Sequence, residues 1–299
     1  ELWSIFSFLM PGYLPPYKSF CSRFEKPIVQ EEDQTAVRRL NQLTGPFILR
    51  RMKSDVLKEL PPKTENVYRI ELEEEQRKLY LAAVVDAREK LQAAKPEDKM
   101  AVFAVLMRLR EICCDPRLIA DNWEGGSAKL DACAELVSSA VEGGHRILLF
   151  SQFTSMLELL AKRLDAEGIS HFTLQGSTPK PVRAELVRRF NGGEVSVFLI
   201  SLRAGGTGLN LTAADIVIHY DPWWNVAAQN QATDRAYRIG QKNPVQVYKL
   251  IAQDTIEEKI VELQQAKQSL ADTVTGTADG AILSMRPDEL LQLLEGSEP

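Results

Sequence analysis

The sequence lacks an apolar run long enough to cross a membrane, and it has few cysteines. A membrane helix needs about 20 consecutive apolar residues, whereas charged residues make up 26% of this 299-residue chain and interrupt its apolar stretches. The four cysteines, Cys21, Cys113, Cys114 and Cys133, form no C-x-x-C pair and have no histidine at ligand spacing. We therefore expect no membrane span, no metal centre, and free buried thiols in a reducing cytoplasm.

Positive charge is also scarce. The 36 lysines and arginines are outnumbered by 41 aspartates and glutamates, so the formal net charge is −5. This balance excludes coating of nucleic acid through bulk charge and leaves only a local basic contact. The residues that could form such a track are Lys180, Arg183, Arg188, Arg189 and Arg203. For any one of them, the charged face of an ordinary amphipathic helix is the simpler interpretation.

The first ten residues, E-L-W-S-I-F-S-F-L-M, are apolar but lack the basic segment and the small-residue cleavage site of a signal peptide. We predict an amphipathic helix for this stretch. The chain begins without methionine, and we expect it to be a fragment of a longer protein.

The two halves of the sequence differ in their pattern. Residues 1–126 alternate helical segments with proline-rich breaks and contain a single short strand-like run, V-Y-R-I at 67–70. From residue 127 onward, short apolar strands alternate with helices, including helices at about 226–239 and 255–268. The expected strands lie at 146–150, 171–174, 195–201, 215–220 and 245–251. This alternation predicts an α/β fold with a parallel sheet covered by helices on both faces.

Ligands of such sheets bind at the carboxyl ends of the strands, so the loops after the strands hold the candidate site. After the strand ending at Ser201 comes L-R-A-G-G-T-G-L-N, in which Gly205, Gly206 and Gly208 permit close backbone approach. Backbone N–H groups in such a loop could cradle a phosphate. A tight turn with no ligand explains the same glycines equally well.

The next strand is followed by D-P-W-W-N, with Trp223 and Trp224 adjacent. An exposed tryptophan offers a flat face on which a base can stack. Because neighbouring residues tend to face opposite ways, we predict that Trp223 packs into the core and that Trp224 points outward.

The stretch Q-A-T-D-R-A-Y-R-I-G-Q at 231–241 carries the most specific pattern. With Asn225 as N-cap, Gln231, Arg235 and Arg238 stand at i, i+4 and i+7 and are predicted to share one helix face. Two guanidinium groups held together suit an anion with several oxygens, such as a phosphate. A simple surface ion pair of Asp234 with Arg238 would explain only part of the pattern. Gly240 is expected just past the helix end.

Arginines of this kind stabilise a transferring phosphoryl group only beside a phosphate-binding loop and a metal-holding carboxylate. No glycine in the sequence is followed by lysine, which excludes the loop G-x-x-x-x-G-K-[ST]. The pair Asp288-Glu289 follows proline and heads a helical segment, so it is not a metal-holding strand end. If ATP is hydrolysed, the nucleotide must be held by a domain outside this sequence.

Four segments together resemble the helicase motifs, in their order, of the second RecA-like lobe of Swi/Snf-type ATP-dependent DNA translocases. They are I-L-L-F-S-Q-F-T-S-M-L, F-T-L-Q-G-S-T, the run from L-I-S-L-R-A-G-G-T-G-L-N to D-P-W-W-N, and Q-A-T-D-R-A-Y-R-I-G-Q. The resemblance covers most of 127–262. Upstream, E-L-W-S-I-F-S-F-L-M-P-G-Y-L and F-I-L-R-R-M-K-S-D-V-L-K-E-L-P-P-K-T-E resemble the end of the first lobe and the linker.

The resemblance implies a domain order and a source. Residues 1–75 would be the helical end of the first lobe with the linker, 76–126 a helical protrusion, 127–262 the second lobe, and 263–299 a C-terminal helical tail. It also implies a bacterial or archaeal member of the family, located in the cytoplasm and associated with the nucleoid if prokaryotic. The acidic tail P-D-E-L-L-Q-L-L-E-G could pack back on the second lobe or dock a partner, and its apolar spacing favours packing.

Site roles follow from the same resemblance. Arg235 and Arg238 would be arginine fingers for ATP, with Gln231 as their polar partner and Gly206 and Gly208 beside the nucleotide. Contacts to the DNA are implied for Gln175, Gly176, Ser177, Ser201, Arg203, Thr207 and Trp224.

The implied protein closes two RecA-like lobes on ATP and walks along one strand of duplex DNA. ATP with Mg²⁺ would be bound mainly by the missing first lobe, so this chain alone is expected to be inactive. The implied partners are double-stranded DNA, the N-terminal lobe of the same protein and possibly a DNA-bound protein. Two alternatives remain open: a DNA- or protein-binding module without catalysis, and a dinucleotide enzyme, for which the G-x-G-x-x-G spacing is missing.

Overall fold

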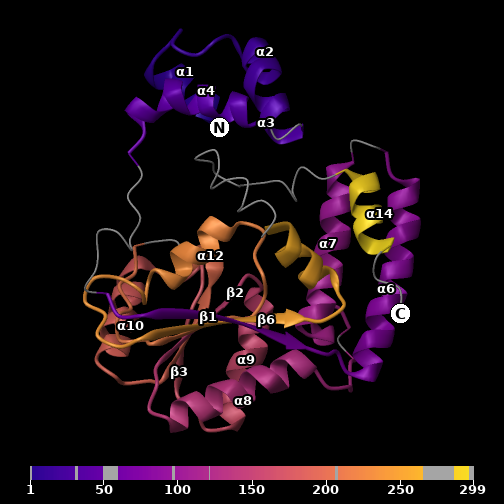
Figure 1. Ribbon diagram of the computed structural model, residues 1–299. Helices are drawn as coiled ribbons and strands as arrows, with labels where there is room; N and C mark the ends of the chain where they lie inside the picture. The colour runs from indigo at the N-terminus through magenta and orange to yellow at the C-terminus, as the bar shows by residue number, and fades with distance from the viewer. Residues whose placement is uncertain are drawn as a thin grey trace. The chain divides into compact units, whose positions relative to one another are not determined.

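A computed structural model describes residues 2–30, 33–49, 60–95, 98–120, 122–205, 208–264 and 286–295. The chain divides into two compact units (Figure 1). Of the described residues, the first unit holds those up to 49, and the second holds those from 60 onward.

The first unit is helical. Its elements are α1 (Leu2–Leu9), α2 (Tyr17–Phe20), the π-helical turn η1 (Cys21–Glu25), α3 (Lys26–Gln30), α4 (Gln34–Thr44) and the 3₁₀ turn η2 (Gly45–Phe47). The predicted amphipathic helix at the start is confirmed, because Phe6 is buried in the cluster of this unit while Phe8 is 84% exposed. The carboxylate of Asp33 caps α4 by accepting a hydrogen bond of 2.7 Å from the Thr35 N–H.

The second unit is built on a six-stranded sheet in which every pairing is parallel. The strands are β1 (Lys63–Ile70), β2 (Ile147–Ser151), β3 (His171–Leu174), β4 (Val197–Ser201), β5 (Ile216–His219) and β6 (Val245–Ala252), in the order β1-β6-β5-β2-β4-β3. The five strands expected after residue 127 are confirmed, and so is the α/β fold.

Strand β1 is longer than the strand-like run that the sequence indicates in the first half of the chain. It pairs with β6 over eight residues, from Lys63 opposite Val245 to Ile70 opposite Ala252. The sequence indicated only a short run at 67–70 because most side chains of β1 are exposed, as expected of an edge strand. The segment predicted to be a linker thus contributes a strand to the sheet.

Helices cover both faces of the sheet (Figure 1). Alternate residues of β2 divide between two cores: Ile147 and Leu149 pack with α8 (Ala128–Glu142) and α9 (Thr154–Ala166), whereas Leu148 and Phe150 pack with α10 (Lys180–Asn191) and α12 (Val226–Thr233). The short helix α11 (Leu202–Gly205) follows β4 directly. The loops at the carboxyl ends of the strands therefore start from a sheet that is packed on both faces.

A third buried cluster joins helices that flank the sheet. It contains α6 (Glu74–Ala93), α7 (Lys99–Cys114), the helical residues 256–264 and α14 (Pro287–Glu295). Leu290 and Leu294 of α14 are fully buried beside α6 and α7, and Arg88 Nη2 donates to the Leu294 carbonyl at 2.8 Å. The packing interpretation of the acidic tail is confirmed. The boundaries at 75, 126 and 262 stay predictions.

Candidate functional site

The helix that leads to the two arginines is shorter than predicted. Asn225 caps α12 as expected, its Oδ1 accepting from the Ala228 N–H at 2.8 Å, but α12 ends at Thr233 and not at 239. Arg235 and Arg238 lie in the turns that follow, at 234–240, which we name the arginine turn. There the i,i+4 ladder gives way to i,i+3 bonds, with the Arg235 N–H donating to the Ala232 carbonyl at 3.1 Å, and the Arg235 carbonyl accepts from the Leu211 N–H at 3.0 Å.

The prediction that Gln231, Arg235 and Arg238 share one helix face is therefore wrong. Gln231 is exposed, Arg238 is half-buried, and Arg235 is 9% exposed. Burial lowers the pKa of Arg235, and the positive charge of Arg238 lowers it further, against an opposing effect of Asp234. The two guanidinium groups thus interact electrostatically in a partly buried place, an arrangement that an anion would stabilise.

Gln241 holds the arginine turn in place. Its Nε2 donates to the carbonyls of Ala214 at 2.7 Å and Ala236 at 3.2 Å, and its Oε1 accepts from the N–H groups of Lys242 and Asn243 at 2.8 and 2.9 Å. The side chain is buried. Sequence reasoning gave Gln241 no role, because nothing local marks an amide that binds four backbone groups.

Gly240, next to this clamp, has φ = +103°, a conformation that glycine adopts without strain. The glycine is required here, although it belongs to the arginine turn and not to the helix end.

The segment that follows β4, residues 202–210, contacts the arginine turn, and we name it the glycine segment. Arg238 Nη1 donates to the Leu209 carbonyl at 3.5 Å, just past Gly208, which has φ = +47°. Gly206 and Thr207 lie outside the described residues, as does the side chain of Arg203. Of the predicted nucleotide contacts, the structure brings together Gly208, Arg235 and Arg238.

Ser201, predicted to contact DNA, is 3% exposed. Its Oγ accepts from the Ala204 N–H at 3.4 Å, so the hydroxyl supports the first turn of the glycine segment. Any contribution of its side chain to binding acts through the loop that it caps.

The Q-G-S-T turn follows β3 and is closed on itself. Gln175 and Thr178 bond each other, with the Thr178 N–H donating to the Gln175 carbonyl at 3.1 Å and the Thr178 Oγ1 accepting from the Gln175 N–H at 3.1 Å. Gly176 and Ser177 are exposed at its tip. Arg183 clamps the turn through its Nε to the Thr178 carbonyl and its Nη2 to the Gly176 carbonyl, both at 2.7 Å.

These contacts revise the basic track. Arg183 holds a loop, Arg188 pairs with Glu185 at 2.6 Å, and Arg189 pairs with Glu194. Exposed ion pairs of this kind contribute little to stability, yet they reduce the positive potential available to a nucleic acid. Lys180, exposed at the start of α10, is the cation of the track nearest to the Q-G-S-T turn in sequence.

The two tryptophans do not divide into a core residue and an outward one. Both are half-buried, with ring centroids 5.5 Å apart. Trp223 packs against the sheet core, and Trp224 packs against the helical cluster, with the guanidinium of Arg110 4.2 Å from its ring centroid. The predicted outward position of Trp224 is therefore wrong, because a cation–π contact draws the ring toward α7.

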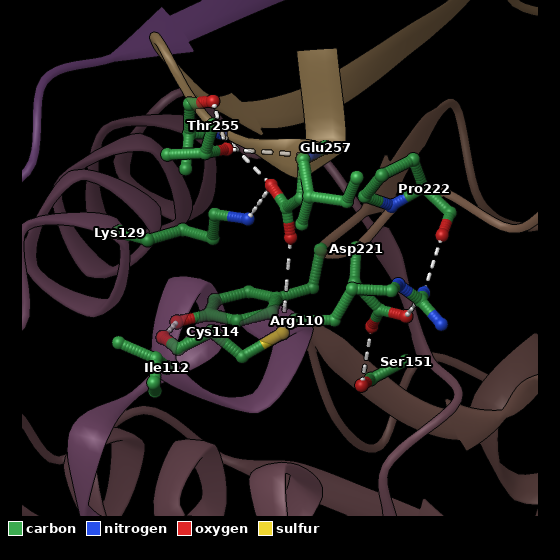
Figure 2. Close-up of polar contacts among 12 residues, drawn as sticks. Arg110, Ile112, Cys114, Lys129, Ser151, Asp221, Pro222, Thr255 and Glu257 are labelled. Carbon is green, nitrogen blue, oxygen red and sulfur yellow. Dashed lines mark hydrogen bonds and ion pairs between the residues drawn. The ribbon is translucent and has the colours of Figure 1, made fainter. Parts of the chain in front are cut away.

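Arg110 belongs to a buried polar network that the sequence did not reveal (Figure 2). Its Nη2 lies 3.2 Å from Asp221 Oδ2, and Asp221 Oδ1 accepts from the Ser151 hydroxyl at 2.6 Å. Burial raises the pKa of Asp221, while Arg110 and the Ser151 hydroxyl act in the opposite direction. Nearby, Lys129 and Glu257 form a second buried ion pair, and Glu257 raises the pKa of Lys129 against the effect of burial.

A buried histidine lies beneath α12. The Nε2 of His219 is 2.9 Å from the Thr233 Oγ1, and the ring stacks on Phe150. Burial, with a smaller effect of Lys249, lowers the pKa of His219 to about 3. The imidazole is therefore neutral at physiological pH.

The described residues contain neither a metal-binding cluster nor a membrane-spanning helix. Within those ranges, no group of three or more histidine, cysteine, aspartate or glutamate side chains is placed to hold a metal ion. In the same ranges, none of the helices has both the length and the apolarity needed to cross a bilayer.

Two protein families match the chain in succession. The SNF2-related domain matches residues 1–118, and the helicase conserved C-terminal domain matches residues 128–240, which include the glycine segment and the arginine turn. The parallel sheet with this order of motifs defines the chain as a RecA-like helicase lobe.

Comparison with individual relatives narrows the class of helicase to which the chain is similar. A putative ATP-dependent helicase/translocase of Bacillus subtilis is 39% identical over 98% of the chain. The SWI2/SNF2 ATPase core domain of Sulfolobus solfataricus is 34% identical, with a TM-score of 0.67 over 98% of this chain and 62% of that one. The same core in complex with double-stranded DNA is 33% identical, with a TM-score of 0.63 over 93% and 60%.

The chain belongs to the Swi/Snf-type, SNF2-related family, and its relatives include ATP-dependent helicases, which confirms the family resemblance. It spans 28 to 33% of the length of three curated bacterial relatives and 19% of the length of longer ones.

Proposed function

We propose that this chain is the C-terminal half of an ATP-driven translocase or remodeller of double-stranded DNA, and that its arginine turn acts on ATP bound by a first lobe of the full-length protein. The observation that carries the proposal is the pair Arg235 and Arg238, held by Gln241 beside Gly208. The motif match over 128–240 and the ATP-dependent helicases among the relatives support it.

In this proposal the two guanidinium groups bind the oxygens of the γ-phosphoryl group and stabilise the charge that develops during its transfer. Gln231, exposed on α12, would orient a polar group of the closed cleft. Bound ATP with Mg²⁺ supplies the phosphoryl group and the metal's charge neutralisation, and both would be held mainly by the first lobe. For this division the described residues offer the two arginine cations to the phosphate.

The DNA contact is proposed for loops at the carboxyl ends of β3 and β4. Gly176 and Ser177 present an exposed turn, and the glycine segment begins directly after β4. Backbone N–H groups and small polar side chains suit phosphate oxygens and read no sequence. The Sulfolobus solfataricus relative in complex with double-stranded DNA supports duplex DNA as the substrate. A DNA-bound protein as cargo, a cytoplasmic or nucleoid location, and Arg203 and Thr207 as contacts belong to the same proposal.

The test is the ATPase activity of the full-length protein with and without duplex DNA. We expect DNA-stimulated turnover by the full-length protein and none by the 299-residue chain. We expect Arg235→Ala or Arg238→Ala to lower kcat by about a thousandfold, as for other arginine fingers. Arg163→Ala is the matched control, because Arg163 forms exposed ion pairs on α9 with Asp131 and Glu167. Robust turnover by the 299-residue chain alone would contradict the proposal.

A further inference from the structure

Arg110 lies near the carboxyl end of α7, with its side chain fully buried. Its Nη2 lies 3.2 Å from Asp221 Oδ2 and donates to the Pro222 carbonyl at 2.5 Å. The guanidinium carbon is 4.2 Å from the Trp224 ring centroid and 5.5 Å from that of Phe153. One side chain thus contacts three of the four residues of D-P-W-W, which we name the tryptophan loop (221–224).

Asp221 is held from the sheet as well. Its Oδ1 accepts from the Ser151 hydroxyl at 2.6 Å and from the Gln152 N–H at 3.2 Å, at the carboxyl end of β2. Figure 2 shows the carboxylate between Ser151 and Arg110. A single buried carboxylate therefore connects the end of α7, the end of β2 and the loop after β5.

Stability alone does not account for this arrangement. A buried ion pair commonly contributes no more than apolar side chains of the same volume would. Moreover, the Nε and Nη1 atoms of Arg110 are buried and have no hydrogen-bond partner among the described residues. The arrangement instead fixes the orientation of the groups around Arg110. A planar guanidinium that stacks on a ring and also donates hydrogen bonds allows its partners few orientations.

The tryptophan loop leads directly to the arginine turn. Asn225, the next residue, caps α12, and the arginine turn follows the end of α12 at Thr233. The position of the tryptophan loop therefore sets where α12 begins. Two side chains of α7, which packs with α6 and α14, contact that loop: the Phe103 ring, 6.1 Å from the Trp224 ring centroid, and Arg110, which alone of the two also donates to its backbone.

We propose that Arg110 is a positioning residue that fixes the tryptophan loop and the start of α12, and so couples the helices α6 and α7 to the arginine turn. The inference rests on the proposed function for its consequence in turnover, because it predicts that the coupling acts on DNA-stimulated hydrolysis. The geometric part, that Arg110 orders residues 221–233, does not depend on any activity.

Loss of Arg110 should leave the helices attached. The buried pair of Lys129 with Glu257 joins α8 to the helical residues 256–264, and the Tyr80 hydroxyl on α6 accepts from the Ile256 N–H at 2.7 Å. Arg110→Lys keeps the charge but has no planar fork, whereas Arg110→Met removes both. Arg108→Lys is the matched control, since Arg108 lies two residues earlier on α7 and is exposed.

The experiment compares these variants in the full-length protein by amide hydrogen exchange and by ATPase assays. For Arg110→Lys and Arg110→Met we expect exchange in 221–233 to speed up by about tenfold or more, with β2 and β4 unchanged, because the loop opens locally. We expect the ratio of DNA-stimulated to basal kcat to fall by about tenfold, as for a typical coupling between sites, while the KM for ATP stays within twofold. Arg108→Lys should match the wild type.

Exchange in 221–233 that stays at the wild-type rate in both Arg110 variants would overturn the inference. Faster exchange across the whole sheet, with basal and stimulated kcat falling together, would also overturn it, because that pattern marks general destabilisation. If the wild-type protein shows no DNA-stimulated ATPase, the proposed function fails, and the exchange comparison alone then decides whether Arg110 positions the loop.

Discussion

Single side chains in this protein carry charge states that their neighbours set. Burial and the charge of Arg238 lower the pKa of Arg235, whereas burial under α12 keeps His219 neutral. Both lie within one short stretch of structure, since Thr233 bonds His219 two residues before Arg235. The imidazole beneath α12 is thus neutral, although the charges of Lys249, Glu65 and Lys63 act on it.

The neutrality of His219 predicts a pH dependence of stability. Its folded pKa of about 3 lies below the unfolded value of 6.5, so the unfolded chain binds a proton first as the pH falls. The native state therefore loses about 1.4 kcal/mol per pH unit below about pH 6.5, down to about pH 3. Above pH 6.5 the histidine contributes no pH dependence.

Urea unfolding of wild type and His219→Gln at several pH values tests this. Between about pH 8 and pH 5, the wild type should lose about 2 kcal/mol more than the variant. His145→Gln is the control, because the His145 side chain is 41% exposed. Equal losses in wild type and His219→Gln would show that His219 is protonated in the folded protein.

Among the elements, α14 depends on a few buried side chains. Leu290 and Leu294 are fully buried against α6 and α7, and Leu293 is only half-buried. Helices of nine residues are marginal in isolation, so the packing of this face is what keeps α14 helical.

Leu290→Ala should therefore release α14. We expect a loss of about 2–5 kcal/mol of local stability, the usual cost of deleting a buried leucine, with faster amide exchange in 287–295 and on the facing side of α6. Leu293→Ala should have a clearly smaller effect. Unchanged protection of α14 in Leu290→Ala would contradict the packing described here.

The elements that the sequence predicts well are those with a local signal. Strands such as β2 and β4 are uninterrupted apolar runs, so they were found. Strand β1 was underestimated because its exposed side chains carry no such run. The end of α12 was misplaced because the Leu211 N–H, which takes the Arg235 carbonyl, lies 24 residues earlier in the chain.

The candidate site likewise has parts that the sequence predicts and parts that it does not. Motif order located the arginine turn and the glycine segment, and residue spacing alone then assigned the arginines to one helix face, which was wrong. The pair of Arg110 with Asp221 joins residues 111 positions apart, so no periodicity or spacing could indicate it. Such partners are fixed only when the third buried cluster assembles beside the sheet.

At the scale of the whole molecule, a net charge of −5 confines any contact with DNA to particular loops. Arg188 and Arg189 are already paired with carboxylates, and Arg183 holds the Q-G-S-T turn. The remaining described cation of the predicted track is Lys180, at the exposed start of α10. We expect few phosphate contacts from this half of the protein.

The salt dependence of DNA binding by the full-length protein tests this. Affinity should fall as salt rises, and Lys180→Ala should reduce the slope of log K against log salt by about one, the effect of one lost phosphate contact. Lys162→Ala is the control, since Lys162 is exposed on α9, which covers the opposite face of the sheet. A flat salt response of the wild type would argue against a phosphate track.

The eight-residue pairing of β1 with β6 also affects how the sheet responds to a pulling force. Residues before 60 connect to the second unit through β1, so tension on that connection enters the sheet at Lys63. In a parallel pair the hydrogen bonds are evenly spaced along the strands, and a pull directed along β1 is shared among them instead of opening one bond after another. The edge strand that the sequence barely signals is thus suited to resist a pull along its own length.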